Sequence, residues 1–277
     1  MSKAEEKVTM VKLCNLMDLP ISSYYHKPVE KTYDMTLTER LTALHQEHGG
    51  KYGKRRMAKT LQNEGFSVSI PKVARLMREA NLIAIRPKKP HYYKAGKAFP
   101  NIPNLLNREF NQENMNTHWV GDITYIRSYE GWSYLATVMD LANREIIGYA
   151  ISQTPDAQLA KDALIDAIKR HRPNTQGLLF HSDQGVQYSA TLFQDALKLH
   201  GITQSMSRRG NCWDNAVQER FFRNLKTEYL NGLSFINHRS VVSAVEHYIR
   251  YYNYKRLNSA IDYLTPAQKR LELLKAA

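Results

Sequence analysis

The feature that most constrains the fold of this chain is a succession of strand and helix patterns that begins at Trp119. Three β-rich runs come first, WVGDITYI, WSYLATVMDL and EIIGYAIS, with turn signals at 128–131 and 142–144 between them. Short β-rich runs joined by tight turns predict an antiparallel meander. The chain then alternates between helix-like and strand-like runs: DAQLAKDALIDAIKRH, GLLFHSD, SATLFQDALKLHG and ITQSMS.

A further helix is predicted in residues 211–230, NCWDNAVQERFFRNLKTEYL. Its predicted N-cap is Asn215 or Asp214, and Asn215 and Gln218 have the spacing of a capping box. Helical periodicity gives this helix an apolar stripe and a separate charged face. The two faces consist of Phe222, Leu225 and Tyr229 and of Glu219, Arg223 and Lys226. A solvated ion pair on a surface helix would explain Glu219 and Arg223 equally well.

The order of these elements is three strands, a helix, a strand, a helix, a strand and a last helix. This order is that of an α/β fold of the ribonuclease-H-like type, and we assign the fold to residues 113–232. In such a fold the first and fourth strands are neighbours, and the last helix packs beside them. Asp122 lies within the first strand, Asp183 ends the fourth, and Glu219 lies on the helix. The three carboxylates are therefore expected to converge.

Carboxylates that converge in this way are suited to hard divalent ions, with Mg²⁺ favoured and Mn²⁺ able to substitute. A pair of such ions can activate an attacking oxygen and stabilise a leaving one in phosphoryl transfer. Aspartate is a poor strand former, so Asp122 inside an apolar strand needs a reason. Metal ligation supplies one, and an edge or bulge position is the alternative. Asp183 could instead be a turn residue, and Asp140 has a smaller claim to join the site.

The front of the chain shows a different pattern, with three short helices predicted between residues 36 and 82. Tight turns and a basic third helix describe a helix-turn-helix unit, which we place at residues 33–85 after an N-terminal helical segment at 1–32. In the third helix Val73, Leu76 and Met77 should face the core. The cationic face beside them, available to a DNA groove or merely solvated, consists of Lys72, Arg75 and Arg78.

Charge is distributed unevenly along the 277 residues, whose formal net charge is +13. Residues 1–112 hold 20 Lys and Arg against 10 Asp and Glu, whereas residues 113–277 hold 19 against 16. A basic front half on a nearly neutral body indicates a polyanion-binding arm. Residues 86–112 contribute as a proline-containing basic linker, in which Arg86, Lys88 and Lys89 could meet phosphates; a plain tether is the alternative.

No apolar run approaches the roughly 18 residues of a membrane span, and no signal peptide is recognisable, so we expect no membrane partner. The two cysteines form no metal-binding spacing, which favours a reduced cytoplasm.

For several other residues near the predicted site, the sequence is compatible with two roles. Arg208 and Arg209 could contact phosphates or be solvated loop cations. Trp213 could stack on a base, but we expect it to brace the loop, and we expect His181 to pack beside the site rather than bind metal. Residues 233–277 are predicted to form a helical segment with a tyrosine-rich core face. The cations left to face DNA or a partner subunit are Arg250, Lys255 and Arg256.

These residues also carry a family resemblance. Asp122 and Asp183 have 60 residues between them, and Asp183 and Glu219 have 35. This spacing resembles the DDE signature of retroviral-type integrases and of the IS-three family of insertion-sequence transposases. The surrounding words WVGDITYI, FHSDQGVQYS and SMSRRGNCWDNAVQERFFRNLKTE are closer to the transposases, as are YGKRRMAKTLQNEGFSVSIPKVARLMREANL and YNYKRLNSAIDYLTP. Asn258 and Arg220 depart from the family pattern, where histidine and serine are common.

The resemblance implies a DDE transposase that binds the terminal inverted repeats of an insertion sequence and cleaves and joins DNA strands with Mg²⁺. It implies Asp122, Asp183 and Glu219 as catalytic metal ligands, Lys226 as a DNA contact, and a multimer that bridges two DNA ends. It further implies a bacterial cytoplasmic, nucleoid-associated protein and an upstream-frame protein joined by frameshifting. The alternatives are a DNA-binding regulator with an inactive integrase-like domain and a ribonuclease H that cuts RNA–DNA hybrids.

Overall fold

The computed structural model describes residues 9–25, 35–86, 102–208 and 211–276. Within these ranges the strands are β1 (His118–Ser128), β2 (Gly131–Asp140), β3 (Ile146–Ser152), β4 (Leu179–Ser182) and β5 (Thr203–Met206). The helices are α1 (Met10–Leu16), α2 (Ile21–Tyr24), α3 (Met35–Glu47), α4 (Lys54–Asn63), α5 (Ile70–Glu79), α6 (Ala157–His171), α7 (Val186–Ser189), α8 (Thr191–Leu199), α9 (Ala216–Glu228), α10 (His238–Tyr254) and α11 (Pro266–Ala276). Short 3₁₀ turns occupy η1 (Cys212–Asn215), η2 (Leu230–Gly232) and η3 (Ser259–Ile261).

The five strands form one mixed sheet in the order β3-β2-β1-β4-β5. β1, β2 and β3 pair antiparallel as a meander, whereas β4 pairs parallel with both β1 and β5. The parallel connections pass through α6 and through α7 and α8, as crossover geometry requires. The predicted meander and the ribonuclease-H-like α/β fold are therefore confirmed.

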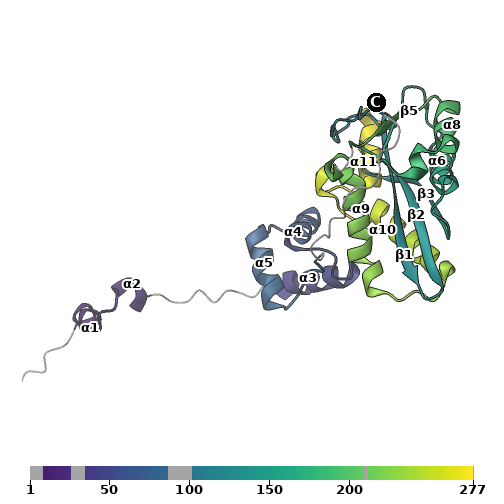
Figure 1. The fold of residues 1–277 in the computed structure, drawn as a ribbon. Helices are drawn as coiled ribbons and strands as arrows, with labels where there is room; N and C mark the ends of the chain where they lie inside the picture. Colours follow the sequence, from purple (N-terminus) through teal and green to yellow (C-terminus); the bar gives the residue numbers. More distant parts are fainter. Residues whose placement is uncertain (1–8, 26–34, 87–101, 209–210, 277) are drawn as a thin grey trace, which may run out of the picture.

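Helices cover both faces of this sheet, because side chains alternate between the two faces along each strand (Figure 1). On one face α6 and α8 pack over Trp119, Val138 and Phe180. On the other face α9 and α10 pack over Val120 and other residues of the meander. The predicted burial of Phe222 and Leu225 is confirmed, since they are 6% and 0% exposed, and the helical C-terminal segment is confirmed as well.

Helices α3, α4 and α5 form a separate small core at the front of the chain. Val73, Leu76 and Met77 of α5 are buried in it as predicted. Ser69 caps α5 by accepting a hydrogen bond from the backbone N–H of Lys72. The three-helix arrangement thus has the helix-turn-helix form that the sequence indicates.

Buried contacts join this unit to the C-terminal part of the chain. The hydroxyl of Tyr52 donates to the carbonyl of Lys255 at 3.0 Å and accepts from the backbone N–H of Leu257 at 2.8 Å. Leu257 itself belongs to the helix-turn-helix core. Arg56 reaches Glu228 at the end of α9, with 3.6 Å between Nη1 and Oε1. Figure 1 accordingly places α4 beside α9.

The expectation that Arg256 faces DNA or a partner subunit is wrong. Its side chain is 2% exposed, and its Nη2 lies 2.6 Å from Oε1 of Glu228, so it does not face DNA or a partner. The hydroxyl of Tyr248 donates to the same carboxylate. A buried cation needs such a partner, and this one lies 28 positions earlier in the chain. Within the described ranges no helix is long and apolar enough to cross a membrane.

Candidate active site

The pairing of β1 with β4 brings the two aspartates to the same level of the sheet. Val120 is the parallel partner of His181, so two residues further along each strand Asp122 and Asp183 reach equivalent positions. Both residues also share the strand face of Val120 and His181, because strand side chains alternate with a period of two. This is the face covered by α9.

Gln218 places Glu219 on this same face. The side chain of Gln218 is fully buried, and its Nε2 donates to the carbonyl oxygens of Val120 at 2.8 Å and Thr137 at 3.2 Å. Thr137 is the strand partner of Asp122 in β2. The first turn of α9 is therefore fixed to the sheet at the level of Asp122.

The predicted capping box at the start of α9 is wrong. The helix begins at Ala216, and Asn215 makes no side-chain capping bond. Gln218 turns into the sheet instead, because the carbonyls of two adjacent strands compete successfully for its amide. The other predicted N-cap residue, Asp214, does not cap α9 either, because its carboxylate binds Arg108 and Arg208.

Backbone N–H groups orient the two aspartates. Oδ1 of Asp122 accepts from the N–H of Ile123 at 2.8 Å, and Oδ1 of Asp183 accepts from the N–H of Gly185 at 3.0 Å. The Oδ2 atoms accept no hydrogen bond from the residues that the structure describes. Each aspartate is thus held through one oxygen, and the other is left for a ligand.

The three carboxylates influence one another electrostatically. Asp122 is half-buried, whereas Asp183 and Glu219 retain solvent access. Desolvation raises the pKa of Asp122 well above its usual value, and the charges of Asp183 and Glu219 add to the rise. Desolvation also raises the pKa of Asp183 and of Glu219, and in Glu219 the charge of Arg223 opposes the rise. The site therefore concentrates negative charge that a cation would stabilise.

Lys226 is a cation of α9 whose charge acts on Asp122, where it lowers the carboxyl pKa. Desolvation lowers the pKa of the Lys226 ammonium, and the charge of Asp122 raises it. The Nζ atom lies 4.5 Å from the centroid of the Tyr125 ring, on the same strand as Asp122. Lys226 and Glu219 are seven residues apart and share one face of the helix, as the periodicity predicts.

A second layer of polar contacts supports the loop that precedes α9. His181 is fully buried, and it contacts the hydroxyls of Ser205 and Ser207 and the carbonyl of Asp214. Burial lowers its pKa to about 4, so the ring is neutral near pH 7. The expectation that His181 packs beside the site is confirmed.

Asp214 holds this loop through two arginines. Its Oδ1 lies 2.7 Å from Nε of Arg108 and 3.0 Å from Nη2 of Arg208. These guanidinium groups lower the pKa of the Asp214 carboxyl, with Arg208 the largest cause. The guanidinium of Arg208 is thus bound within the protein. Trp213 does not brace the loop as expected, since it is 67% exposed.

The carboxylates of the candidate site have the chemistry of a divalent-ion site. Within the described ranges, no group of three or more His, Cys, Asp or Glu side chains stands close enough to hold a metal as positioned. The chemistry of the donors nevertheless fits, because they are carboxylates only, two have an unengaged oxygen, and the charges of Asp183 and Glu219 raise the pKa of Asp122. Asp122 and Asp183 would hold such an ion, with Glu219 as the third carboxylate.

Comparison with known proteins agrees with this architecture. The family model described as integrase core domain matches residues 112–212, and a second model of the same description matches 200–266. An HTH-like domain matches residues 32–90. The transposase for insertion sequence element IS904 of Lactococcus lactis is 37% identical over 83% of this chain and 91% of its own length. This chain belongs to the insertion-sequence transposases of the IS-three family.

A further relative agrees with this membership. The transposase InsF for insertion sequence IS3A of Escherichia coli is 39% identical over 79% of this chain and 76% of its own length. Among solved structures, the HTLV-2 integrase catalytic core domain aligns at 18% identity with a TM-score of 0.43, covering 56% of this chain and 95% of that chain. The sequence identity to the insertion-sequence transposases identifies this protein as a DDE transposase, a polynucleotidyl transferase that binds DNA. Integrase-core DDE enzymes depend on divalent metal ions.

The predicted DNA contacts of the transposase lie on several elements. On α5, Lys72 and Arg75 are half-exposed and Arg78 is exposed, with 3.8 Å between Nε of Arg75 and Oε1 of Glu79. Arg86 is exposed after α5, and Arg223 is half-exposed on α9. Lys88, Lys89 and Arg209 lie outside the described residues.

Two residues near the site escaped the sequence analysis. Gln218 looked like half of a capping box, and Arg144 looked like an ordinary turn residue between strands. Arg144 is 5% exposed, and its Nη2 donates to the carbonyl of Phe110 at 2.8 Å. No local signal distinguishes a buried turn arginine from a solvated one, because its burial depends on segments remote in sequence.

Proposed function

We propose that this transposase binds the terminal inverted repeats of its own insertion sequence and cleaves and joins DNA strands at Asp122, Asp183 and Glu219, with Mg²⁺ as the metal. The observation that supports the proposal is that β1, the end of β4 and the first turn of α9 bring Asp122, Asp183 and Glu219 near enough for the charges of Asp183 and Glu219 to raise the pKa of Asp122. Mn²⁺ is expected to substitute, since it accepts the same oxygen ligands.

Divalent ions bound there would activate the attacking oxygen and stabilise the leaving one during in-line transfer. The protein groups supply position and charge. Backbone N–H groups fix the rotamers of Asp122 and Asp183, and Gln218 fixes the helix that carries Glu219. Lys226, on the same helix face as Glu219, is placed to contact a phosphate of the DNA strand that enters the site.

The helix-turn-helix unit supplies sequence recognition in this proposal. The exposed Arg78 and the half-exposed Lys72 and Arg75 form the cationic face of α5, which would enter the major groove of the repeat. Strand joining would require two ends at once, so we expect a homo-oligomer on DNA, formed alone or with an upstream-frame protein. We expect the protein to act in the bacterial cytoplasm, where it would be associated with the DNA of the nucleoid.

The test is strand cleavage and joining on duplexes that carry the element ends. Wild type is compared in Mg²⁺, in Mn²⁺ and without metal, and then with Asp183→Asn and Glu219→Gln. Asp195→Asn is the matched control, because Asp195 is an exposed carboxylate on α8. We expect metal-dependent products that fall about a thousandfold or more in both site variants and not in the control, with DNA binding retained.

Other outcomes would refute the proposal in different ways. DNA binding without chemistry, repeated with the fused upstream frame, would indicate an inert regulator. Cleavage of RNA–DNA hybrids in preference to duplex ends would indicate a ribonuclease H. Full activity of Glu219→Gln would show that Glu219 is not a member of the active site.

A further inference from the structure

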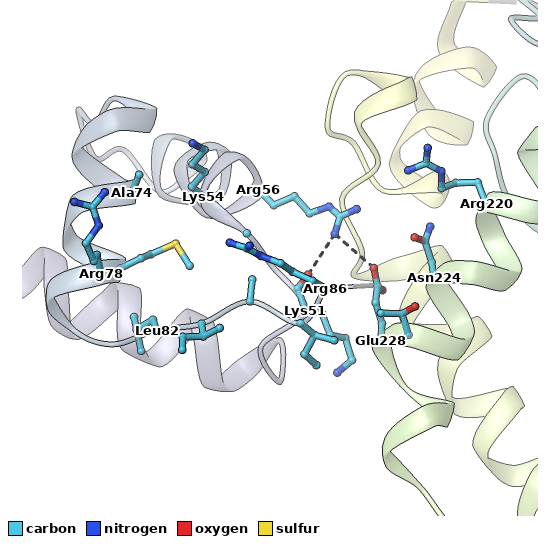
Figure 2. A pocket seen from close by; sticks show the side chains of 16 residues that line it. Lys51, Lys54, Arg56, Ala74, Arg78, Leu82, Arg86, Arg220, Asn224 and Glu228 are labelled. Atoms are coloured by element: carbon cyan, nitrogen blue, oxygen red, sulfur yellow. Dashed lines mark hydrogen bonds and ion pairs between the residues drawn. The ribbon is translucent and has the colours of Figure 1, made fainter. Parts of the chain in front are cut away.

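A cationic groove separates the helix-turn-helix unit from α9 (Figure 2). It has a volume of about 610 Å³, and its cationic lining residues are Lys51, Lys54, Arg56, Arg78, Arg86 and Arg220. Among the described residues that line this groove, Glu228 is the one carboxylate, and Arg256 and Arg56 already neutralise it. Figure 2 shows Arg56 reaching across the groove to Glu228.

Most of these cations are available to a ligand. Lys54, Arg78, Arg86 and Arg220 are exposed, and they form no ion pair with any residue in the described ranges. A concentration of unpaired cations in a concave surface attracts and holds anions. The ligand of this groove is therefore expected to be anionic and extended.

The groove continues into a second cavity of about 410 Å³, which we call the Arg144 cavity. The two share Arg56, Arg220 and Asn224 in their linings. In the part of the chain that the structure describes, the lining of the Arg144 cavity holds four arginines, Arg56, Arg144, Arg220 and Arg256, and no Asp or Glu. The positive surface thus extends without interruption from the helix-turn-helix unit to a buried arginine of the catalytic core.

Arg144 supplies an independent observation that points to a ligand. The residue is 5% exposed, and Nη2 donates to the carbonyl of Phe110 and to Oδ1 of Asn111. Nε and Nη1 are buried without a hydrogen-bond partner among the described residues. Unsatisfied buried donors of a charged group are costly, and a phosphate oxygen would satisfy them through charge-assisted hydrogen bonds.

Helix α9 links this groove to the active site. Successive helix residues are about 100° apart around the axis, so Arg220 faces away from the Glu219 side by about that angle. Val217, Arg220, Phe221 and Asn224 recur at helical spacing and line the Arg144 cavity. A phosphate held by Arg220 is thus held one residue from the carboxylate that we place in the site.

We infer that the groove and the Arg144 cavity bind the phosphodiester backbone of the element-end DNA between the helix-turn-helix unit and the active site, with Arg220 and Arg144 as phosphate contacts. The inference rests on the proposed function, which makes duplex DNA the substrate. The groove would fix the register of the bound strand relative to Glu219, and it carries no base-reading role, because phosphate contacts position the DNA without reading its sequence.

The test measures the affinity of element-end duplexes as a function of salt for wild type, Arg220→Gln, Arg144→Gln and a control, Arg239→Gln. Arg239 is exposed on α10 and is not part of either lining. Loss of one phosphate contact should weaken binding about tenfold and reduce the slope of log K against log salt by about one. We expect both effects in the first two variants and neither in the control.

Neutral methylphosphonates placed one at a time along the duplex then locate the contact. At one or two positions the substitution should weaken wild type about tenfold but leave Arg220→Gln unchanged, because that variant has already lost the contact. Arg220 is exposed, so this variant remains decisive even if Arg144→Gln does not fold. Equal effects at every position in wild type and Arg220→Gln would overturn the inference.

Two further outcomes are distinguishable. If inorganic phosphate raises the melting temperature of wild type but not of Arg144→Gln, and the methylphosphonate scan is flat, the cavity takes free phosphate and the DNA assignment is wrong. If wild type does not bind element-end DNA at all, the proposed function fails and this inference fails with it. Binding and cleavage that persist in Arg220→Gln and Arg144→Gln with an unchanged salt slope would refute this inference alone.

Discussion

Replacement of Gln218 by methionine separates the hydrogen bonds of this side chain from its volume. Methionine is unbranched and similar in length, so the packing between α9 and the sheet should persist. The two hydrogen bonds that its amide donates to the carbonyls of Val120 and Thr137, at 2.8 Å and 3.2 Å, would be lost, together with the longer one, at 3.5 Å, that its Oε1 accepts from the Thr137 hydroxyl. At about 1 to 1.5 kcal/mol for each buried bond, we expect the free energy of unfolding to fall by about 2 to 3 kcal/mol.

Urea unfolding would measure this change, with Gln158→Met as the matched control. Gln158 is exposed on α6, and surface substitutions of this kind change stability by no more than about 0.5 kcal/mol. The reasoning also predicts a functional effect, because Gln218 positions the helix that carries Glu219. Under conditions where the variant is fully folded, strand cleavage should fall about tenfold or more, since small misplacements of a reacting group are costly.

The result that would refute this reasoning is a midpoint for Gln218→Met that matches the Gln158→Met control. In that case the sheet, and not the Gln218 amide, would hold the first turn of α9. A stability loss without any loss of cleavage would instead mean that Glu219 keeps its position by other contacts, or that it does not belong to the site.

Two further predictions concern the sheet beside the site. Gly121→Ala should lower the free energy of unfolding by about 1 to 3 kcal/mol, because its new Cβ would overlap Cζ of the buried Phe180 ring. The control is Gly232→Ala, where no atom of the described residues lies within 4 Å of the new Cβ, and equal urea midpoints would contradict the prediction. Acidification should also destabilise the protein through His181, whose pKa falls from 6.5 to about 4 on folding, so that its penalty grows as the pH drops below 6.5 and is complete below about 4. Between pH 7.5 and pH 5 the loss in the free energy of unfolding amounts to about 2 kcal/mol. His181→Gln should lack this part of the pH dependence of the free energy of unfolding. The same pH dependence in the variant and in wild type would contradict the prediction.

The sequence allowed the architecture to be predicted because its local patterns agree with the tertiary fold. Alternation in the three β-rich runs and helical spacing on α5 and α9 reflect burial on one face, which periodicity reports directly. Asp122 was identifiable for a related reason: a charged side chain inside an apolar strand conflicts with its surroundings unless a ligand or partner compensates. The catalytic roles of the three carboxylates stay a prediction, which the cleavage assay tests.

Predictions that failed depend on partners far away in the chain. Arg256 follows an amphipathic helix and looks solvent-facing, but Glu228 captures it from 28 positions earlier. Gln218 has the spacing of a capping residue, yet the nearest strong acceptors are strand carbonyls 98 and 81 positions away. A polar side chain near a helix start fits several roles equally well, and only the position of α9 on the sheet selects among them.

Helix α9 presents a different environment on each of three faces. The effect of a substitution on α9 should therefore depend on the face that carries the residue, and not on how far along the helix the residue lies. Phe222 and Leu225 are buried against the sheet, Glu219 lies beside the aspartates, and Arg220 lines the groove. Glu219 and Asn224 differ by only about 7.5 Å along the axis, and a packed helix does not bend easily over that length. A phosphate held on the groove face would consequently be held at a fixed offset from Glu219. Weakening the groove should then alter where the DNA is cut as well as how tightly it binds.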